Sequence, residues 1–372
     1  MIGRTRRLWT LQPSRFAALS RGRARLAWLA VLLLVLASLT ALAVPSLTGD
    51  GATSVATADR MTDVGLYERV VAAMKGGDTY YVAASDAMRA GGYPLRPFFT
   101  MRLPALAAFE ALIPGWASIA LLLALAALTA FAWASRVGVA LNGLFPRAVM
   151  MLLLAVSMLA FFQPGLVLFH EVWAGLLVAL SLALRRPGRA LEAIALGLAA
   201  MLIRETAALY AIVMLLFAWG EGRRREALGW GVALLVFAGV LALHAHAVAG
   251  VTGPLDAASP GWSAFNGPGF FLRALVTSTA LQALPVVVGA ILIVLAMLGW
   301  ASWDEPLGLR MFALLIAYGV VISIFARLDN FYWALMIAPA ALVGLVFVPD
   351  ALADLWHRAL DRRRITVTTV TP

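Results

Sequence analysis

The chain has 372 residues, of which 63% are hydrophobic and only 13% are charged. A soluble domain has about 25% charged residues, so this composition excludes a soluble globular protein and predicts an all-α, polytopic membrane protein. The formal net charge of +10 does not predict nucleic-acid binding, because arginines cluster between apolar runs, where positive charge orients membrane proteins. The absence of cysteine excludes disulfides, thiolate catalysis and Cys-ligated metals.

The N-terminal part of the chain combines a basic segment, 1–25, with an apolar run, 26–44. The apolar core of a signal peptide has about 7–15 residues, so this longer run predicts a retained first span that begins in the cytoplasm. Residues 45–113 are predicted to form a periplasmic first loop, which ends in an interfacial segment at 103–113. Abundant Ala, Leu and Arg beside a single Lys are typical of GC-rich bacterial genomes, so the predicted location is the bacterial inner membrane.

Nine further apolar runs are predicted to be spans, and they cover 116–133, 148–163, 167–184, 190–203, 206–219, 229–247, 284–300, 309–326 and 331–349. Ten spans place the C-terminal tail, 350–372, on the same side as the N-terminus. The chain 1–372 is therefore predicted to be a single transmembrane domain with both termini cytoplasmic. The Gly- and Pro-rich loop 248–269 is predicted to lie outside, either as a lid over a substrate or as a connector.

The segment 190–219 is apolar except for a few residues near its middle, including Arg204 and Glu205. Basic clusters flank it on both sides, so it should cross the membrane an even number of times. Each of two short helices would cover only about 21 Å of a roughly 30 Å core. Arg204 and Glu205 should therefore lie below the outer surface, in a protein-lined cavity. A buried charge pair at this position is expensive and is therefore a candidate functional site, and an ion pair between Arg204 and Glu205 is the alternative role.

The first loop contains two related segments, 67–77 and 81–92, which both end in a Gly pair. Apolar residues in the first segment recur at i, i+3, i+4 and i+7, which is one face of a helix, and the second segment shows the same spacing more weakly. A Gly pair is a typical helix stop. We expect two short amphipathic helices on the outer membrane face.

The sequence Asp63-Val-Gly-Leu-Tyr67, followed after eight residues by Gly76-Gly77-Asp78-Thr-Tyr80-Tyr81, resembles the Asp-x-x-x-Tyr and Gly-x-x-x-Tyr first-loop pattern of the glycosyltransferase-C (GT-C) class. The most similar branch is the bacterial mannosyltransferase-like group that uses polyprenyl-phosphate sugars. The resemblance covers loop 63–104 well and the C-terminal third poorly. It implies a ring of membrane helices around a periplasmic cavity and an acidic base in the first loop. The acidic pair of some members is missing here, so no cofactor is predicted and a divalent metal is not supported.

The resemblance implies that Asp63 is the catalytic base and that Tyr67 and Tyr81 belong to the substrate site. An N-cap of the following helix is the alternative role for Asp63. Asp78 precedes the second helix in the same way, and there a cap is favoured over a substrate contact. Glu171 faces the same compartment and is a candidate to orient an acceptor hydroxyl, although a carboxylate at a helix start has the same pattern.

The phosphate-linked donor that the resemblance implies needs cations, and Arg204 is the leading candidate to hold its phosphate. Three further arginines are candidates for the same role. Arg96 and Arg102 flank 97–99 near the end of the first loop, where snorkelling to lipid headgroups is the alternative. Arg327 ends a span on the outer side, against the trend of positive charge inside, and a local pair with Asp329 is its alternative role. Metal ligands are not predicted.

The leading functional prediction is an integral-membrane glycosyltransferase that moves a sugar from a polyprenyl-phosphate carrier to an envelope glycan or glycolipid. Its expected partners are that donor, the acceptor and the bilayer, without nucleic acid. A transporter or flippase of lipid-linked sugars is one alternative, although the charged residues of the apolar runs gather towards the outer side. A non-catalytic membrane subunit of an envelope-synthesis complex is the other.

Overall fold

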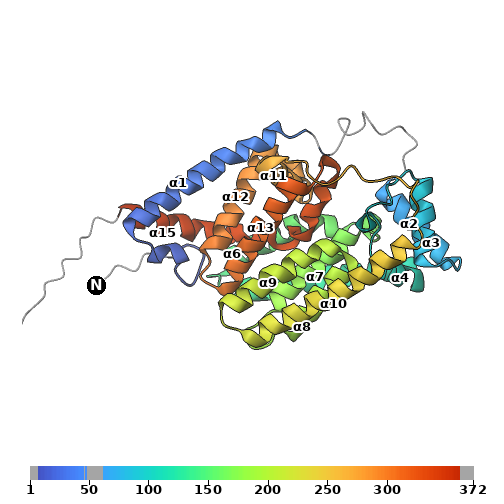
Figure 1. Cartoon of the computed structure of the whole chain (residues 1–372). Helices are drawn as coiled ribbons and strands as arrows, with labels where there is room; N and C mark the ends of the chain where they lie inside the picture. Colours follow the sequence, from blue (N-terminus) through green and yellow to red (C-terminus); the bar gives the residue numbers. More distant parts are fainter. Residues whose placement is uncertain (1–6, 46, 48–61, 361–372) are drawn as a thin grey trace, which may run out of the picture.

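The computed structural model describes residues 7–45, 47 and 62–360, and within them every regular element is a helix (Figure 1). The α-helices are α1 (Arg21–Ala37), α2 (Asp63–Lys75), α3 (Tyr80–Ala90), α4 (Ala105–Leu112), α5 (Gly115–Gly138), α6 (Leu144–Met158), α7 (His170–Leu184), α8 (Leu191–Ile203), α9 (Ala208–Gly220), α10 (Arg224–Ala249), α11 (Gly267–Thr277), α12 (Val286–Ser302), α13 (Pro306–Phe325), α14 (Ala338–Ala341) and α15 (Val348–Leu360). The all-α fold class is thus confirmed for the described residues.

Six helical segments are long and apolar enough to cross a membrane: Arg21–Ala43, Gly115–Gly138, Leu144–Phe162, Arg224–Ala249, Pro306–Phe325 and Ala338–Leu360. Four shorter apolar helices accompany them: His170–Leu184, Leu191–Ile203, Glu205–Gly220 and Val286–Ser302. Each predicted span overlaps one of these segments. The structure therefore supports a membrane-embedded helical protein.

Helix α7 occupies the centre of the molecule. All of its residues except Leu184 are buried, as expected for a helix that is apolar on every face. Helix α7 also provides hydrogen-bond partners for neighbouring helices. The Trp133 indole N–H of α5, for example, donates to the Ala179 carbonyl at 3.0 Å. The buried N-terminus of α7 carries His170 and Glu171 into the candidate site.

The two predicted helices of the first loop are confirmed as α2 and α3, and both end in the same way. Gly77 and Gly92 adopt positive φ angles of 106° and 67°. The next residue in each case donates its N–H back to the last turn, Asp78 to Ala73 at 3.2 Å and Tyr93 to Met88 at 2.9 Å. These contacts are Schellman motifs, which explains the repeated Gly pairs.

Loops that are distant in sequence meet at two opposite ends of the molecule. Helices α2, α3 and α4 lie at one end, and α15 lies at the other (Figure 1). At the end with α15, the main chain at 9–11 pairs with that at 140–142. Arg185 binds Glu226 at 2.8 Å, and Arg310 binds Glu221 at 2.7 Å. The two basic clusters that flank 190–219 therefore lie at the same end, as the hairpin interpretation requires.

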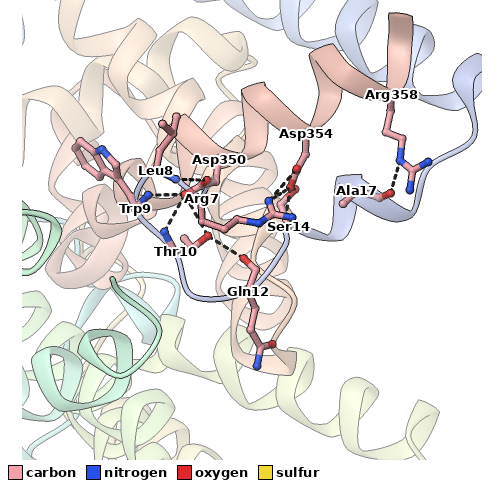
Figure 2. Close-up of polar contacts among 10 residues, drawn as sticks. All are labelled: Arg7, Leu8, Trp9, Thr10, Gln12, Ser14, Ala17, Asp350, Asp354 and Arg358. Atoms are coloured by element: carbon pink, nitrogen blue, oxygen red, sulfur yellow. Dashed lines mark hydrogen bonds and ion pairs between the residues drawn. The ribbon is translucent and has the colours of Figure 1, made fainter. Parts of the chain in front are cut away.

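The N-terminal segment is held against α15 by two carboxylates (Figure 2). Asp350 accepts the main-chain N–H groups of residues 8–10 at 2.8–2.9 Å. Asp354 binds the Arg7 guanidinium at 2.8 Å and the Ser14 hydroxyl at 2.8 Å. Helix α15 thus continues to Leu360, well into the segment 350–372 that was predicted to be a tail, and residues 361–372 lie outside the described part.

The last predicted span, 331–349, is not one regular α-helix. It consists of two 3₁₀ segments, η8 (Leu328–Met336) and η9 (Leu342–Phe347), on either side of α14. A Cβ at Gly344 would collide with the backbone of α12 at Ala296, so this close approach requires glycine. This close packing depends on a helix that is distant in the sequence. The apolar run alone therefore predicted a simple span and not the irregular helix.

Candidate functional site

A cavity of about 760 Å³ opens at the end that carries α2, α3 and α4. Its wall comes from these loop helices, from the start of α7, from the turn between α8 and α9, and from α10, α13 and η8. Six predicted site residues line it: Asp63, Tyr67, Arg102, Arg204, Glu205 and Arg327. The other four do not, and they are Arg96, Asp78, Tyr81 and Glu171.

One face of α2 forms the side of the cavity, through Asp63, Leu66, Tyr67, Val70 and Val71. These positions follow the i, i+3, i+4, i+7 spacing of a helix face. The sequence predicted an apolar face on this helix but assigned it to the membrane surface, whereas the structure places it in the cavity wall.

Asp63 is not the N-cap of α2. Thr62 has that role, and its hydroxyl accepts the Gly65 N–H at 3.2 Å. The Asp63 carboxylate instead accepts the Tyr93 hydroxyl at 3.0 Å and faces the cavity. The capping alternative for Asp63 is therefore wrong.

The capping interpretation of Asp78 is also wrong, because Thr79 occupies the N-cap position of α3 and its side chain makes no capping hydrogen bond. The backbone at Asp78 closes the turn after α2, and its side chain is exposed. Asp78 lies outside the cavity wall, so its predicted substrate contact has no geometric support.

Arg204 and Glu205 lie at the α8–α9 turn, in the cavity wall, as the hairpin argument predicts. The Arg204 side chain is 1% exposed, and its Nε donates to Glu171 at 2.5 Å. A second nitrogen of the same guanidinium pairs with Glu205. The predicted ion pair is thus present. Glu171, with its side chain fully buried, adds a second carboxylate, for which the sequence had left open an acceptor contact or a helix-start role.

Arg102 continues this chain of charges towards the loop helices. It approaches Glu205 at 3.6 Å, and its Nε donates to the Tyr67 hydroxyl at 3.4 Å. The Tyr80 hydroxyl donates to the Arg102 carbonyl at 2.5 Å, which fixes the backbone here. Burial raises the pKa of the Tyr67 and Tyr80 hydroxyls, so both stay protonated. The four alternating charges Glu171, Arg204, Glu205 and Arg102 form a connected row, which we call the charge row.

Arg327 lines the cavity beside η8 and binds Asp329 in a bidentate pair at 3.1 and 2.8 Å. This geometry matches the local-pair alternative that its sequence position suggested. Arg327 is about one-third exposed, so the pair is open to exchange with a ligand.

Tyr81 ties α3 to α10 instead of lining the cavity. Its hydroxyl lies 3.2 Å from His244 Nδ1, and His244 Nε2 lies 3.1 Å from the Met101 carbonyl. A carbonyl only accepts, so Nε2 donates and Nδ1 accepts the Tyr81 hydroxyl. His244 is 2% exposed, and this buried bridge explains why a histidine stands in an apolar helix.

Arg96 holds the loop 248–269 and does not line the cavity. Its Nε donates to the Asp256 carbonyl at 2.9 Å, and its carbonyl accepts the Ser259 N–H at 2.7 Å. Trp262 packs on Phe99 with ring centroids 4.8 Å apart and lines the cavity. The loop is therefore an anchored part of the cavity wall.

The loop 248–269 is also held by a bidentate ion pair, in which two guanidinium nitrogens of Arg89 in α3 each bind a carboxylate oxygen of Asp256 at 2.9 Å. This hydrogen-bonded pair lowers the pKa of Asp256 to about 2. Because the folded pKa lies below the unfolded value of about 3.9, the pair stabilises the loop above that value and is lost as the pH falls through about 2.

We expect the thermal stability of the wild type to exceed that of Asp256→Asn by a constant amount between pH 5 and 8. This excess should shrink only below about pH 4, where the unfolded chain takes up the proton. Paired melting curves at each pH measure it. Asp86→Asn is the matched control, since Asp86 meets the same Arg89 at 3.3 Å but is 70% exposed. A stability gap that closes near pH 6 would contradict the expected pair.

Several cavity residues were missed by the sequence analysis. Five of them carry buried polar atoms without a hydrogen-bond partner in the described structure, and they are Glu110, His170, Thr206, Asn330 and Trp333. A buried polar atom without a partner costs about 1–3 kcal/mol, so such a group calls for an explanation. Glu110 is a carboxylate in a largely apolar segment, a signal that could have identified it.

Within the described residues no group of three or more His, Cys, Asp or Glu side chains is arranged to hold a metal ion. Glu205 and Asp329 of the cavity are paired with arginines, Glu110 accepts a hydrogen bond from Ser118, and Asp63 accepts one from Tyr93. Comparison with protein families, with curated proteins and with solved structures finds no match for this chain.

Proposed function

We propose that the chain is an integral-membrane glycosyltransferase that moves a sugar from a polyprenyl-phosphate carrier to an acceptor of the cell envelope. The observation that carries this proposal is the cavity chemistry, in which unpartnered donors and acceptors stand beside cationic side chains. Trp333 offers a donor, Asn330 offers an acceptor atom, and His170 offers both. A sugar hydroxyl both donates and accepts, so such a mixture suits a sugar ring.

The charge row supplies a place for the phosphate. Glu171 already neutralises Arg204, whereas Arg102 has only the more distant Glu205 and retains 17% side-chain exposure. A phosphate oxygen can therefore replace Glu205 at Arg102 at a smaller energetic cost. In this proposal Arg102 makes the direct contact, and Arg204 holds Glu205 in place.

Asp63 is proposed as the base. It takes the proton of the acceptor hydroxyl while that oxygen forms a bond to the anomeric carbon. The bond between the anomeric carbon and the phosphate oxygen breaks, and polyprenyl phosphate leaves with the electron pair. Cations then stabilise the charge on the leaving phosphate.

The proposal includes ten membrane crossings in the bacterial inner membrane, with both termini in the cytoplasm and the cavity facing the periplasm. The arginine-rich end that carries Arg185 and Arg223 fits the cytoplasmic side under the positive-inside rule.

Sidedness can be measured with single cysteines, since the native chain has none. Asp78→Cys and Arg225→Cys both replace exposed side chains, at opposite ends of the molecule. A membrane-impermeant thiol reagent applied to spheroplasts should label Asp78→Cys directly and Arg225→Cys only after lysis. Labelling of both positions from the same side would overturn the proposed topology.

The activity is tested with purified protein in liposomes that contain a panel of polyprenyl-phosphate hexoses and pentoses and an envelope lipid extract. Release of polyprenyl phosphate reports transfer of any sugar, and a labelled sugar identifies the acceptor. The proposal predicts both signals. Movement of intact carrier between leaflets without release would instead indicate a flippase.

A further inference from the structure

Part of the cavity wall is apolar and is not used by the proposed reaction, and we call this part the apolar arm. It extends along α2 away from Asp63 and is lined by the buried side chains Leu66, Val70, Val71, Met88, Leu106 and Ala107. Most of these belong to a small hydrophobic cluster formed by the loop helices. The sugar and phosphate chemistry of the charge row gives no reason for such a surface.

One carboxyl group stands in this arm. Glu110 of α4 is 3% exposed and lines the cavity. Its Oε2 accepts the Ser118 hydroxyl at 2.5 Å, and its Oε1 has no hydrogen-bond partner in the described structure. An unpaired buried carboxylate is unfavourable, so a neutral acid or a bound ligand is the expected state of this group.

The surroundings of Glu110 favour the neutral acid. Burial raises the pKa of this carboxyl, and the Ser118 hydrogen bond and the charge of Lys75 offset only part of that effect. A protonated carboxyl can donate a hydrogen bond, and Oε1 is the oxygen of Glu110 that has no partner in the described structure. Its natural partner is an uncharged oxygen, such as a hydroxyl or an ester carbonyl.

The charge that acts on Glu110 comes from the end of α2 opposite Asp63. Lys75, whose charge acts on Glu110, is the last residue of α2, whereas Asp63 is the first. At 1.5 Å per residue, about 18 Å separate these two ends. A ligand that reaches both must be elongated, and its part near Glu110 must be mostly apolar.

We infer that this arm binds the aliphatic part of a lipid acceptor and that Glu110 donates a hydrogen bond to an oxygen near its chain. This inference rests on the proposed function and narrows the acceptor to a lipid with a free hydroxyl at its head. The prenyl chain of the donor is a poorer occupant, because it has no polar atom besides its phosphate. That phosphate belongs to the arginines of the charge row.

The binding test needs no turnover. Protein in lipid nanodiscs is irradiated with either a dodecyl glycoside or a prenyl phosphate, each carrying an aryl diazirine on its chain. The dodecyl glycoside should label α2, α3 and α4, and Ala107→Phe, which fills the arm, should abolish that labelling. Preferential labelling of these helices by the prenyl phosphate would assign the arm to the donor and overturn the inference.

Kinetics give the second test, on Glu110→Gln and Glu110→Leu. Gln can still accept from Ser118 and donate into the arm, so its KM for an alkyl-chain acceptor should stay near that of the wild type. Leu removes the hydrogen bond, and the KM should rise about tenfold at unchanged kcat, which corresponds to about 1.4 kcal/mol. The KM for a short-chain acceptor and for the donor should not change.

Glu68→Leu is the matched control, since Glu68 is an exposed carboxylate of α2 that lies outside the cavity wall. An equal KM in Glu110→Leu and Glu68→Leu would overturn the role of Glu110. If the dodecyl glycoside labels the arm but the protein shows no transferase activity, the proposed function is contradicted. The inference that the arm binds a lipid would still stand. The two failures are therefore distinguishable.

Discussion

Replacement of Asp63 by Asn is expected to lower turnover by about 10²–10⁴-fold, the usual contribution of a general base. Asn still accepts the Tyr93 hydroxyl that binds Asp63 at 3.0 Å, and Thr62 still caps the helix. The variant should therefore fold normally and lose only the capacity to take a proton. Initial rates of polyprenyl phosphate release, measured beside melting curves, test both parts.

Asp78→Asn is the matched control for this experiment. Asp78 is an acidic residue of the same loop, but it is exposed and outside the cavity wall. Its variant should keep full turnover. Equal turnover in the two variants would remove Asp63 from the mechanism, and the base would then have to be sought elsewhere in the cavity.

Much of the fold was predictable because its determinants are local. Apolar runs predicted the membrane helices, and the periodicity from Tyr67 to Met74 predicted α2. The contact between the N-terminal segment and α15 was not predictable, because Asp350 meets the main chain of residues 8–10 only after folding. No sequence pattern links positions more than 300 residues apart.

The candidate site was predictable where a charge stands in an apolar segment. Arg204 and Glu205 were placed in a cavity by length and charge alone, and the structure confirms that position. Their third partner, Glu171, was noted without its pairing, because the contact joins separate helices. Tyr81 was assigned to the substrate site from a motif that does not state which face of the helix each residue occupies.

The charge row makes Arg204 the most sensitive position for stability. Arg204→Gln would leave Glu171 fully buried without its arginine, and breaking a buried pair from one side costs about 3–5 kcal/mol. Arg204→Lys should restore little, because an ammonium group cannot reproduce two directed contacts of a guanidinium. Melting temperatures of both variants against the wild type measure this effect.

The double variant Arg204→Gln, Glu171→Gln separates the structural role of Arg204 from direct binding of phosphate. If Arg204 serves mainly to neutralise Glu171 and does not contact the phosphate, removal of both buried charges should recover most of the lost stability and also the affinity for polyprenyl phosphate. Arg102→Gln should then weaken carrier binding with a much smaller effect on melting, since Arg102 is partly exposed. If Arg204 contacts the phosphate itself, the double variant should regain stability and still fail to bind the carrier. The affinity of the stabilised double variant for polyprenyl phosphate therefore decides which arginine of the charge row holds the leaving group.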